Sequence, residues 1–162
     1  MVLRWAKILA ALSVGVWGLL GTFGNLSDLP GVYAEVSQVT TMIDVPEGVG
    51  PPVRSDNAVI VGIGTAAIVL GKIAALIGGV FGGLGMLRTV NGTAEAFHAS
   101  KTLAVAGCGL SFVLMYVTFT VIGESLYFMF YTPAYVGAAE LAFRLSASVA
   151  LVALFIAQRE PA

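Results

Sequence analysis

Long apolar runs alternate with short polar connections along this chain. A helix of roughly 20 apolar residues crosses the ~30 Å hydrocarbon core of a bilayer. Four runs reach that length, at about residues 6–24, 58–87, 101–123 and 133–157. The fourth run has a suitable start, because Pro133 is tolerated in a first helical turn. The pattern predicts an all-α fold, a four-helix transmembrane bundle.

The composition agrees with a membrane location. Of the 162 residues, 58% are hydrophobic and 10% are charged, whereas soluble domains average about 45–50% apolar and about 25% charged residues. Such a chain cannot cover itself with polar side chains, so its expected surroundings are the lipid bilayer. The length predicts one domain over residues 1–162. The net charge of −1 and the absence of a basic patch argue against nucleic acid as a partner.

The connection at residues 25–57 is the only long one. Apolar residues recur there at spacings of four, three and four, which places them on one helical face; they are Val32, Val36, Val39 and Ile43. This spacing predicts a short amphipathic helix between Gly31 and Asp44, lying on the outer membrane surface. An irregular loop with incidental valines remains the alternative.

Basic residues in the connections predict the orientation, because cytoplasmic loops carry an excess of lysine and arginine. Five fall on one side of the predicted membrane, namely Arg4, Lys7, Arg88, Lys101 and Arg159. Only Arg54 falls in a connection on the other side. The distribution therefore predicts that both termini are cytoplasmic.

The second apolar run is longer than a bilayer requires. Residues 58–87 would form ~45 Å of helix at 1.5 Å per residue. This helix must either tilt or project from the bilayer. Its register decides whether Lys72 lies near the midplane or extends toward the outer surface.

Four ionisable residues lie in or at the edge of the predicted spans: Lys72, Glu124, Glu140 and Arg144. A charge at the centre of a span costs about 2.5–3.5 kcal/mol, so these side chains are expected to face protein or water. Glu140 and Arg144 are four residues apart on one helical face and can pair. We expect the four residues to form a polar cluster in the outer half of the bundle.

Two interpretations of that cluster remain open. In the first, the cluster is a structural set of ions. In the second, it is functional: a pocket for a lipid headgroup, a quinone or a small anion, or part of a proton or ion path. Aromatic residues that neighbour it suit both a membrane interface and such a pocket; they are Tyr127, Phe128, Phe130, Tyr131 and Tyr135.

Glycines recur at helical spacings in the first two spans. The candidates for close helix packing are Gly15, Gly18, Gly78, Gly79, Gly82 and Gly83. Small residues let membrane helices approach closely and gain van der Waals contact. The pattern is consistent with packing inside this bundle and also with a face for a partner subunit or a second copy.

Candidate catalytic chemistry is sparse. His98 is the only histidine and is predicted to lie on the opposite membrane face from Ser125, so no Ser–His pair can form. Cys108 is the only cysteine. We expect no enzyme activity, no metal and no cofactor.

Several short motifs, in this order, resemble a family of predicted small integral membrane proteins, domain of unknown function 2165. They are Leu3–Ile8, Asn25–Asp28, Val39–Met42 with Asp44, Phe97–Lys101, Ile122–Glu124 and Phe143–Arg144. Asn25 and Asp28 are thereby marked as a candidate loop motif. Lys72 stands where the family pattern has a glutamate. The resemblance implies four helices and a bacterial inner membrane, and it implies no activity.

Three functions are compatible with these features. The first is a non-catalytic accessory, assembly or structural subunit that associates with other membrane subunits or with itself. The second is a small oligomeric transporter or channel component that uses the charged cluster. The third is a membrane anchor that binds quinone or lipid.

Overall fold

A computed structural model describes residues 1–160 of the chain. Its elements follow the order of the sequence, and no strand occurs among these residues. They are α1 (Val2–Ser27), α2 (Leu29–Thr40), α3 (Ala58–Leu76), η1 (Ile77–Gly82), α4 (Gly83–Arg88), α5 (Ala94–Ser100), α6 (Thr102–Tyr116), η2 (Val117–Glu124), η3 (Met129–Tyr131) and α7 (Pro133–Ala157). The all-α fold is therefore as predicted.

Four continuous helices are long and apolar enough to cross a membrane. They are Val2–Ser27, Ala58–Arg88, Ala94–Glu124 and Pro133–Ala157. Large apolar side chains on them point away from the bundle, such as Leu20, Ile63 and Leu151, each about two-thirds exposed. Lipid can cover this surface where water cannot do so without cost. The protein is an integral membrane protein of four apolar helices.

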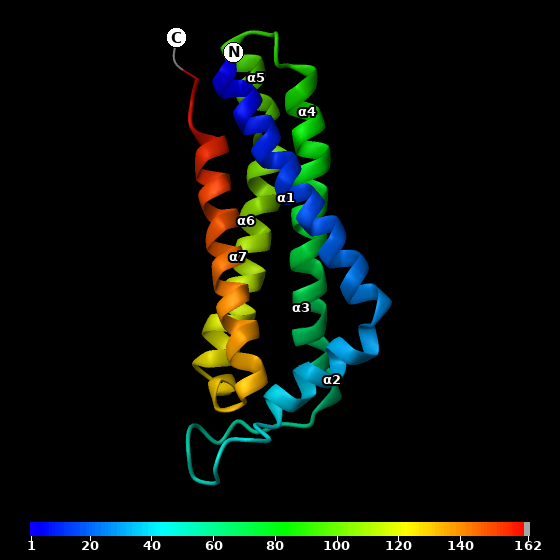
Figure 1. The fold of residues 1–162 in the computed structure, drawn as a ribbon, viewed down its shortest axis with the longest axis vertical. Helices are drawn as coiled ribbons and strands as arrows, with labels where there is room; N and C mark the ends of the chain where they lie inside the picture. Colours follow the sequence, from blue (N-terminus) through cyan, green and yellow to red (C-terminus); the bar gives the residue numbers. More distant parts are fainter. Residues whose placement is uncertain (161–162) are drawn as a thin grey trace.

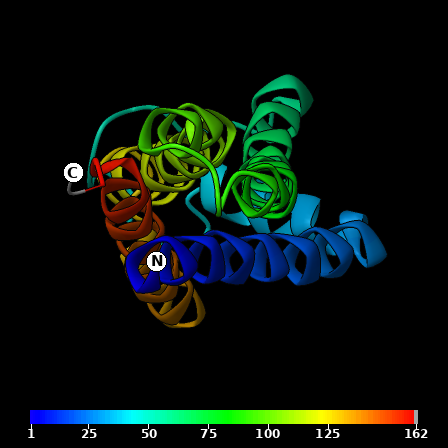
Figure 2. The ribbon, with the colours of Figure 1, turned by 90° about the horizontal axis from the view of Figure 1, so that it is seen from above.

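The first helix is tilted strongly against the other three, which run more nearly parallel (Figures 1 and 2). Both termini lie at the same end of the bundle, and α2 lies at the opposite end (Figure 1). We call these the terminal end and the α2 end. A chain that crosses a bilayer four times has both termini on one face, so this arrangement suits four crossings.

Two of the long helices contain π-helical segments. The six residues of η1 interrupt the helix from Ala58 to Arg88, and the eight residues of η2 end the helix that began at Ala94. Segments of π-helix often accompany functional sites. Apolar periodicity did not predict either one, because a π-turn changes the hydrogen-bond partner without changing which residues are apolar.

The α2 helix occupies the loop in which a surface helix was expected. Its N-cap is Asp28, whose Oδ1 accepts a hydrogen bond of 3.0 Å from the Gly31 backbone N–H. Pro30 in the first turn suits this start, since it needs no N–H partner. The helix returns under the bundle and touches α3, where a Cβ on Gly64 would lie 2.9 Å from Val36 Cγ1. Its predicted position on a membrane surface remains a prediction.

Glycine contacts bring the first three long helices together. A Cβ added to Gly79 would lie 2.2 Å from the backbone N of Gly15, and one added to Gly78 would lie 2.6 Å from Gly107 Cα. Both distances are shorter than any real contact, so these helices are in backbone-to-backbone contact. The side chain of an alanine would force them apart.

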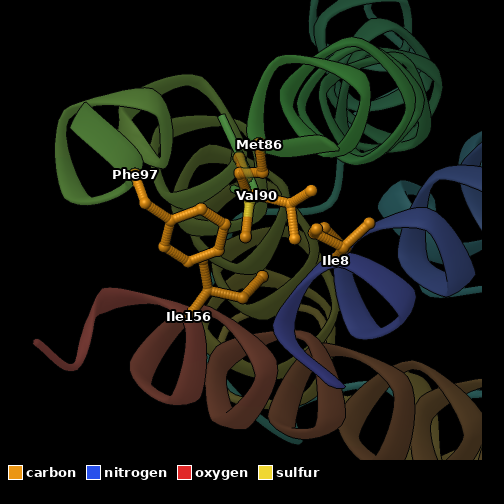
Figure 3. Close-up of a cluster of buried hydrophobic side chains, with 7 residues drawn as sticks. Ile8, Met86, Val90, Phe97 and Ile156 are labelled. Atoms are coloured by element: carbon orange, nitrogen blue, oxygen red, sulfur yellow. The ribbon is translucent and has the colours of Figure 1, made fainter. Parts of the chain in front are cut away.

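A compact apolar core closes the terminal end of the bundle (Figure 3). The core contains side chains from α1, α4, α5 and α7. It also contains Val90, from the turn after α4. The labelled members are Ile8, Met86, Val90, Phe97 and Ile156, all buried. Phe97 comes from the short helix α5, at the start of the long helix Ala94–Glu124.

Candidate functional site

The predicted polar cluster does not form an ion-pair network in the structure. Glu140 and Arg144 are exposed on α7, while Lys72 and Glu124 are half-buried on other helices. The salt bridges found within residues 1–160 are two in number, and both involve Glu160. Glu140 and Arg144 are therefore not paired here, although their spacing permits it.

Lys72 has an aromatic partner instead of a carboxylate. Its Nζ lies 3.8 Å from the centre of the Trp17 ring on α1. Its aliphatic stem passes Gly21, where an added Cβ would lie 2.8 Å from Lys72 Cδ. The residue lies near the middle of the Ala58–Arg88 helix. Trp17 therefore supplies an attractive face to a cation that the bilayer interior would disfavour.

The six glycines singled out in the sequence all lie at contacts between helices of this chain. Gly15 and Gly79 meet between α1 and η1, and Gly18 meets the backbone of Leu76. The remaining three contact Gly107, Ala104 and Leu12; they are Gly78, Gly82 and Gly83. Packing within the bundle occupies these glycines, so they are not free for a partner.

The loop motif has a structural role at one of its residues. Asp28 caps α2, and this explains why a carboxylate follows the first span. The Asn25 side-chain nitrogen is buried and has no hydrogen-bond partner within residues 1–160. The two residues lie on either side of the change of direction between α1 and α2.

A cavity of about 390 Å³ lies at the α2 end, between α2, α3, η2 and α7. Its walls are mainly aliphatic and aromatic side chains, and they include Tyr127 and Tyr135 from the predicted aromatic set. Small-molecule pockets typically measure about 300–1,000 Å³ and are mostly apolar. The volume and lining of this cavity fit that description.

Polar groups gather at one edge of this cavity. Glu35 on α2 lines it, and the Tyr135 hydroxyl on α7 donates a 2.6 Å hydrogen bond to Gln38 Oε1 on α2. This bond links the first turns of α7 to α2. None of the four residues of the predicted cluster lines the cavity. Sequence reasoning missed Glu35 because it sits in a loop helix and not in an apolar run.

A second charged site, at the terminal end, was also missed. Lys7 Nζ and Lys101 Nζ both lie 2.7 Å from Glu160 Oε1. Both ammonium groups also donate to the Gln158 carbonyl oxygen, at 2.6 and 2.7 Å. The two lysine side chains are almost completely buried. These bonds hold the chain after α7 against α1 and the start of α6.

The pKa of Glu160 reflects this site. Burial alone would raise the pKa of the carboxyl group, but hydrogen bonds and charges from Lys101 and Lys7 outweigh it, and the pKa falls below its usual value. All the contacts of this site are made between segments of the same chain, so its role is structural. Among residues 1–160, no three His, Cys, Asp or Glu side chains are placed to hold one metal ion.

Comparison with known proteins identifies a family. The model of a family described as "Predicted small integral membrane protein (DUF2165)" matches residues 3–159, which is nearly the whole chain. No curated protein and no solved structure matches.

Proposed function

The chain belongs to the family of predicted small integral membrane proteins (DUF2165), and from that premise we propose that it is a non-catalytic subunit that assembles with another protein of the membrane. The partner would bind the outward face of α7. One observation carries this proposal: Arg144 is exposed at the middle of α7.

Arg144 lies near the middle of α7, where a charge is costly in lipid. A charged residue at the centre of a membrane helix costs about 2.5–3.5 kcal/mol when it must face lipid. Glu140, one turn earlier, is also exposed. Neither residue has a salt-bridge partner within residues 1–160. A partner helix with an acidic group opposite Arg144 and a basic group opposite Glu140 would remove this cost.

The small size of the extramembrane parts supports the same function. The connections outside the four long helices are short, apart from residues 28–57. Such a chain can act chiefly through its membrane surface. The predicted location in a bacterial inner membrane, with cytoplasmic termini, belongs to this proposal.

Site-specific photo-crosslinking in the native membrane tests the proposal. A photo-reactive amino acid would replace Leu141, which is exposed beside Glu140, or Leu110, which is exposed on α6. We expect an adduct with a second membrane protein from position 141 and a much weaker one from position 110. The adduct should be lost when Arg144→Leu is added.

The mass of the adduct decides between partners. An adduct that contains a different membrane protein supports the role of a subunit in a larger complex. An adduct of twice the mass of the chain, with no other partner, would instead indicate a homo-oligomer. No adduct at position 141, or equal adducts at both positions, would contradict the proposed binding face.

A further inference from the structure

The cavity at the α2 end is open to the membrane. Two of its lining residues, Ile63 on α3 and Ile122 on η2, are 65% and 39% exposed. Both lie on helices that are long and apolar enough to cross the bilayer. The opening therefore faces lipid, and an apolar chain can enter it from the side without crossing water.

The edge of the cavity next to α2 carries negative charge. Glu35 lines the cavity, and no lysine or arginine does. Glu35 has no salt bridge within residues 1–160. Asp44 follows α2 in the same connection and is also exposed. Glu35 is exposed at this edge, so its carboxylate is available to a cation.

Arg54, the one basic residue among residues 28–57, is already bound. The Arg54 guanidinium donates to the carbonyl oxygens of Val45 and Pro46. Residues 28–57 contain one arginine and five carboxylates: Asp28, Glu35, Asp44, Glu47 and Asp56. The charge at this end of the protein is thus complementary to a cation.

We propose that this cavity binds an amphiphile of the bilayer that has an apolar chain and a protonated amine headgroup. The chain lies among the aliphatic residues of α3 and η2, and the amine pairs with the Glu35 carboxylate. Burial of apolar surface favours the chain, and a charge-assisted hydrogen bond favours the amine. A phosphate or carboxylate headgroup next to Glu35 would be repelled.

The geometry of α2 supports this assignment. The helix contacts α3 at Val36 and Gly64, and it is tied to α7 by the bond from Tyr135 to Gln38. These contacts hold Glu35 at the boundary between the spans and the loop. An amphiphile has an apolar chain that ends in a polar headgroup. A binding site for it therefore needs an apolar cavity with a charged group at its edge.

A photolabel competition experiment tests the proposal. The full chain is reconstituted in phosphatidylcholine vesicles and labelled with a dodecylamine that carries a diazirine in its chain. Unlabelled dodecylamine, dodecanol and dodecyl phosphate compete separately, and labelled peptides are mapped by mass spectrometry. We expect labels on the cavity residues of α3 and η2, with dodecylamine competing roughly tenfold better than the other two, as suits a hydrogen bond to a charged group.

Two matched pairs of variants locate the binding site. Ala67→Phe fills the cavity and should abolish the labelling, whereas Ala66→Phe, at the exposed neighbouring position outside the cavity, should not. Glu35→Gln should remove the preference for the amine, whereas Glu47→Gln, a loop carboxylate outside the cavity, should keep it. Ala138→Leu is a second cavity-filling variant if Ala67→Phe does not fold, as judged by circular dichroism.

The proposal is overturned by any of three results. The first is specific labelling that survives both cavity-filling variants. The second is competition by dodecyl phosphate or dodecanol that equals that of dodecylamine. The third is the absence of saturable labelling in the unaltered chain.

Discussion

The ammonium group of Lys72 lies 3.8 Å from the centre of the Trp17 ring, and this contact joins α3 to α1 inside the bundle. It is a cation–π interaction between two membrane-spanning helices. The contact accounts for a lysine near the middle of an apolar helix that has no salt-bridge partner among residues 1–160. It also has an energetic consequence that a double-mutant cycle can measure.

We predict that Lys72→Met and Trp17→Leu are coupled by roughly 0.5–2 kcal/mol, the usual range for a cation–π contact. Each variant and the combination would be unfolded reversibly in detergent, and the free energy of unfolding compared. A control cycle that combines Lys72→Met with Trp5→Leu should show no coupling, because Trp5 lies at the terminal end of α1. Additive effects of Lys72→Met and Trp17→Leu would contradict the interaction.

Gly79→Ala should destabilise the protein by about 1–3 kcal/mol, because overpacking a close contact forces backbone to move. The new methyl group would lie 2.2 Å from the Gly15 backbone nitrogen. Gly109→Ala is the control, since nothing lies within 4 Å of its added Cβ. That variant should be neutral or more stable, by up to about 1 kcal/mol of helix propensity. Thermal unfolding would measure both, and equal losses would argue against the packing role.

The stability of the protein should fall in acid because of Glu160. Its pKa is lowered by Lys101 and Lys7 against the opposing effect of burial. A carboxyl group whose folded pKa lies below its unfolded value of about 4.3 stabilises the protein above that pH. The stabilisation is lost as the pH falls from about 4.3 through the lower folded pKa.

Thermal unfolding between pH 7 and pH 3 would check this dependence. Glu160→Gln should reduce stability at pH 7 by roughly 1.5–3 kcal/mol, as for a lost hydrogen bond to a charged group, and should flatten the acid slope. Glu95→Gln, at an exposed position on α5 at the same end, should leave the slope unchanged. An unaltered slope in Glu160→Gln would show that other carboxyl groups cause the acid sensitivity.

Arg144→Leu should leave the isolated chain as stable as before, or more stable, since Arg144 has no ion-pair partner within residues 1–160. Removing a charge from the centre of a span also lowers the cost of membrane insertion by about 2.5–3.5 kcal/mol. Unfolding in detergent and a membrane-insertion assay would measure the two effects. A clear loss of stability would mean that Arg144 serves the fold of the single chain and would weaken the proposed partner interface.

The membrane fold was predictable from sequence because it follows from one-dimensional properties. The length of each apolar run and the hydrocarbon thickness decide that four helices are required, and the structure contains four such helices. The spacing of Gly78, Gly79 and Gly82 likewise indicated close packing, because residues on one helical face recur at regular intervals. Neither property depends on which helix lies beside which.

The candidate site depends on neighbours in space, which is why sequence reasoning located it only partly. Lys72, Glu124, Glu140 and Arg144 were grouped by depth, but depth does not specify the direction in which a helix face points. The tilt of α1 brings Trp17 to Lys72, and the folding of α2 under the bundle brings Glu35 to the cavity. Those two juxtapositions join residues far apart in the chain.

The length of the apolar runs thus determined the number of spans, and a span in lipid is helical because it must satisfy its own backbone hydrogen bonds. The close approach of the first three long helices was decided by packing, through the backbone contacts of Gly15, Gly79 and Gly107. Rotation also decided that Arg144 faces outward while Lys7 and Lys101 meet Glu160. The bilayer imposes length and polarity on every helix alike, and only contacts between helices distinguish one face from another.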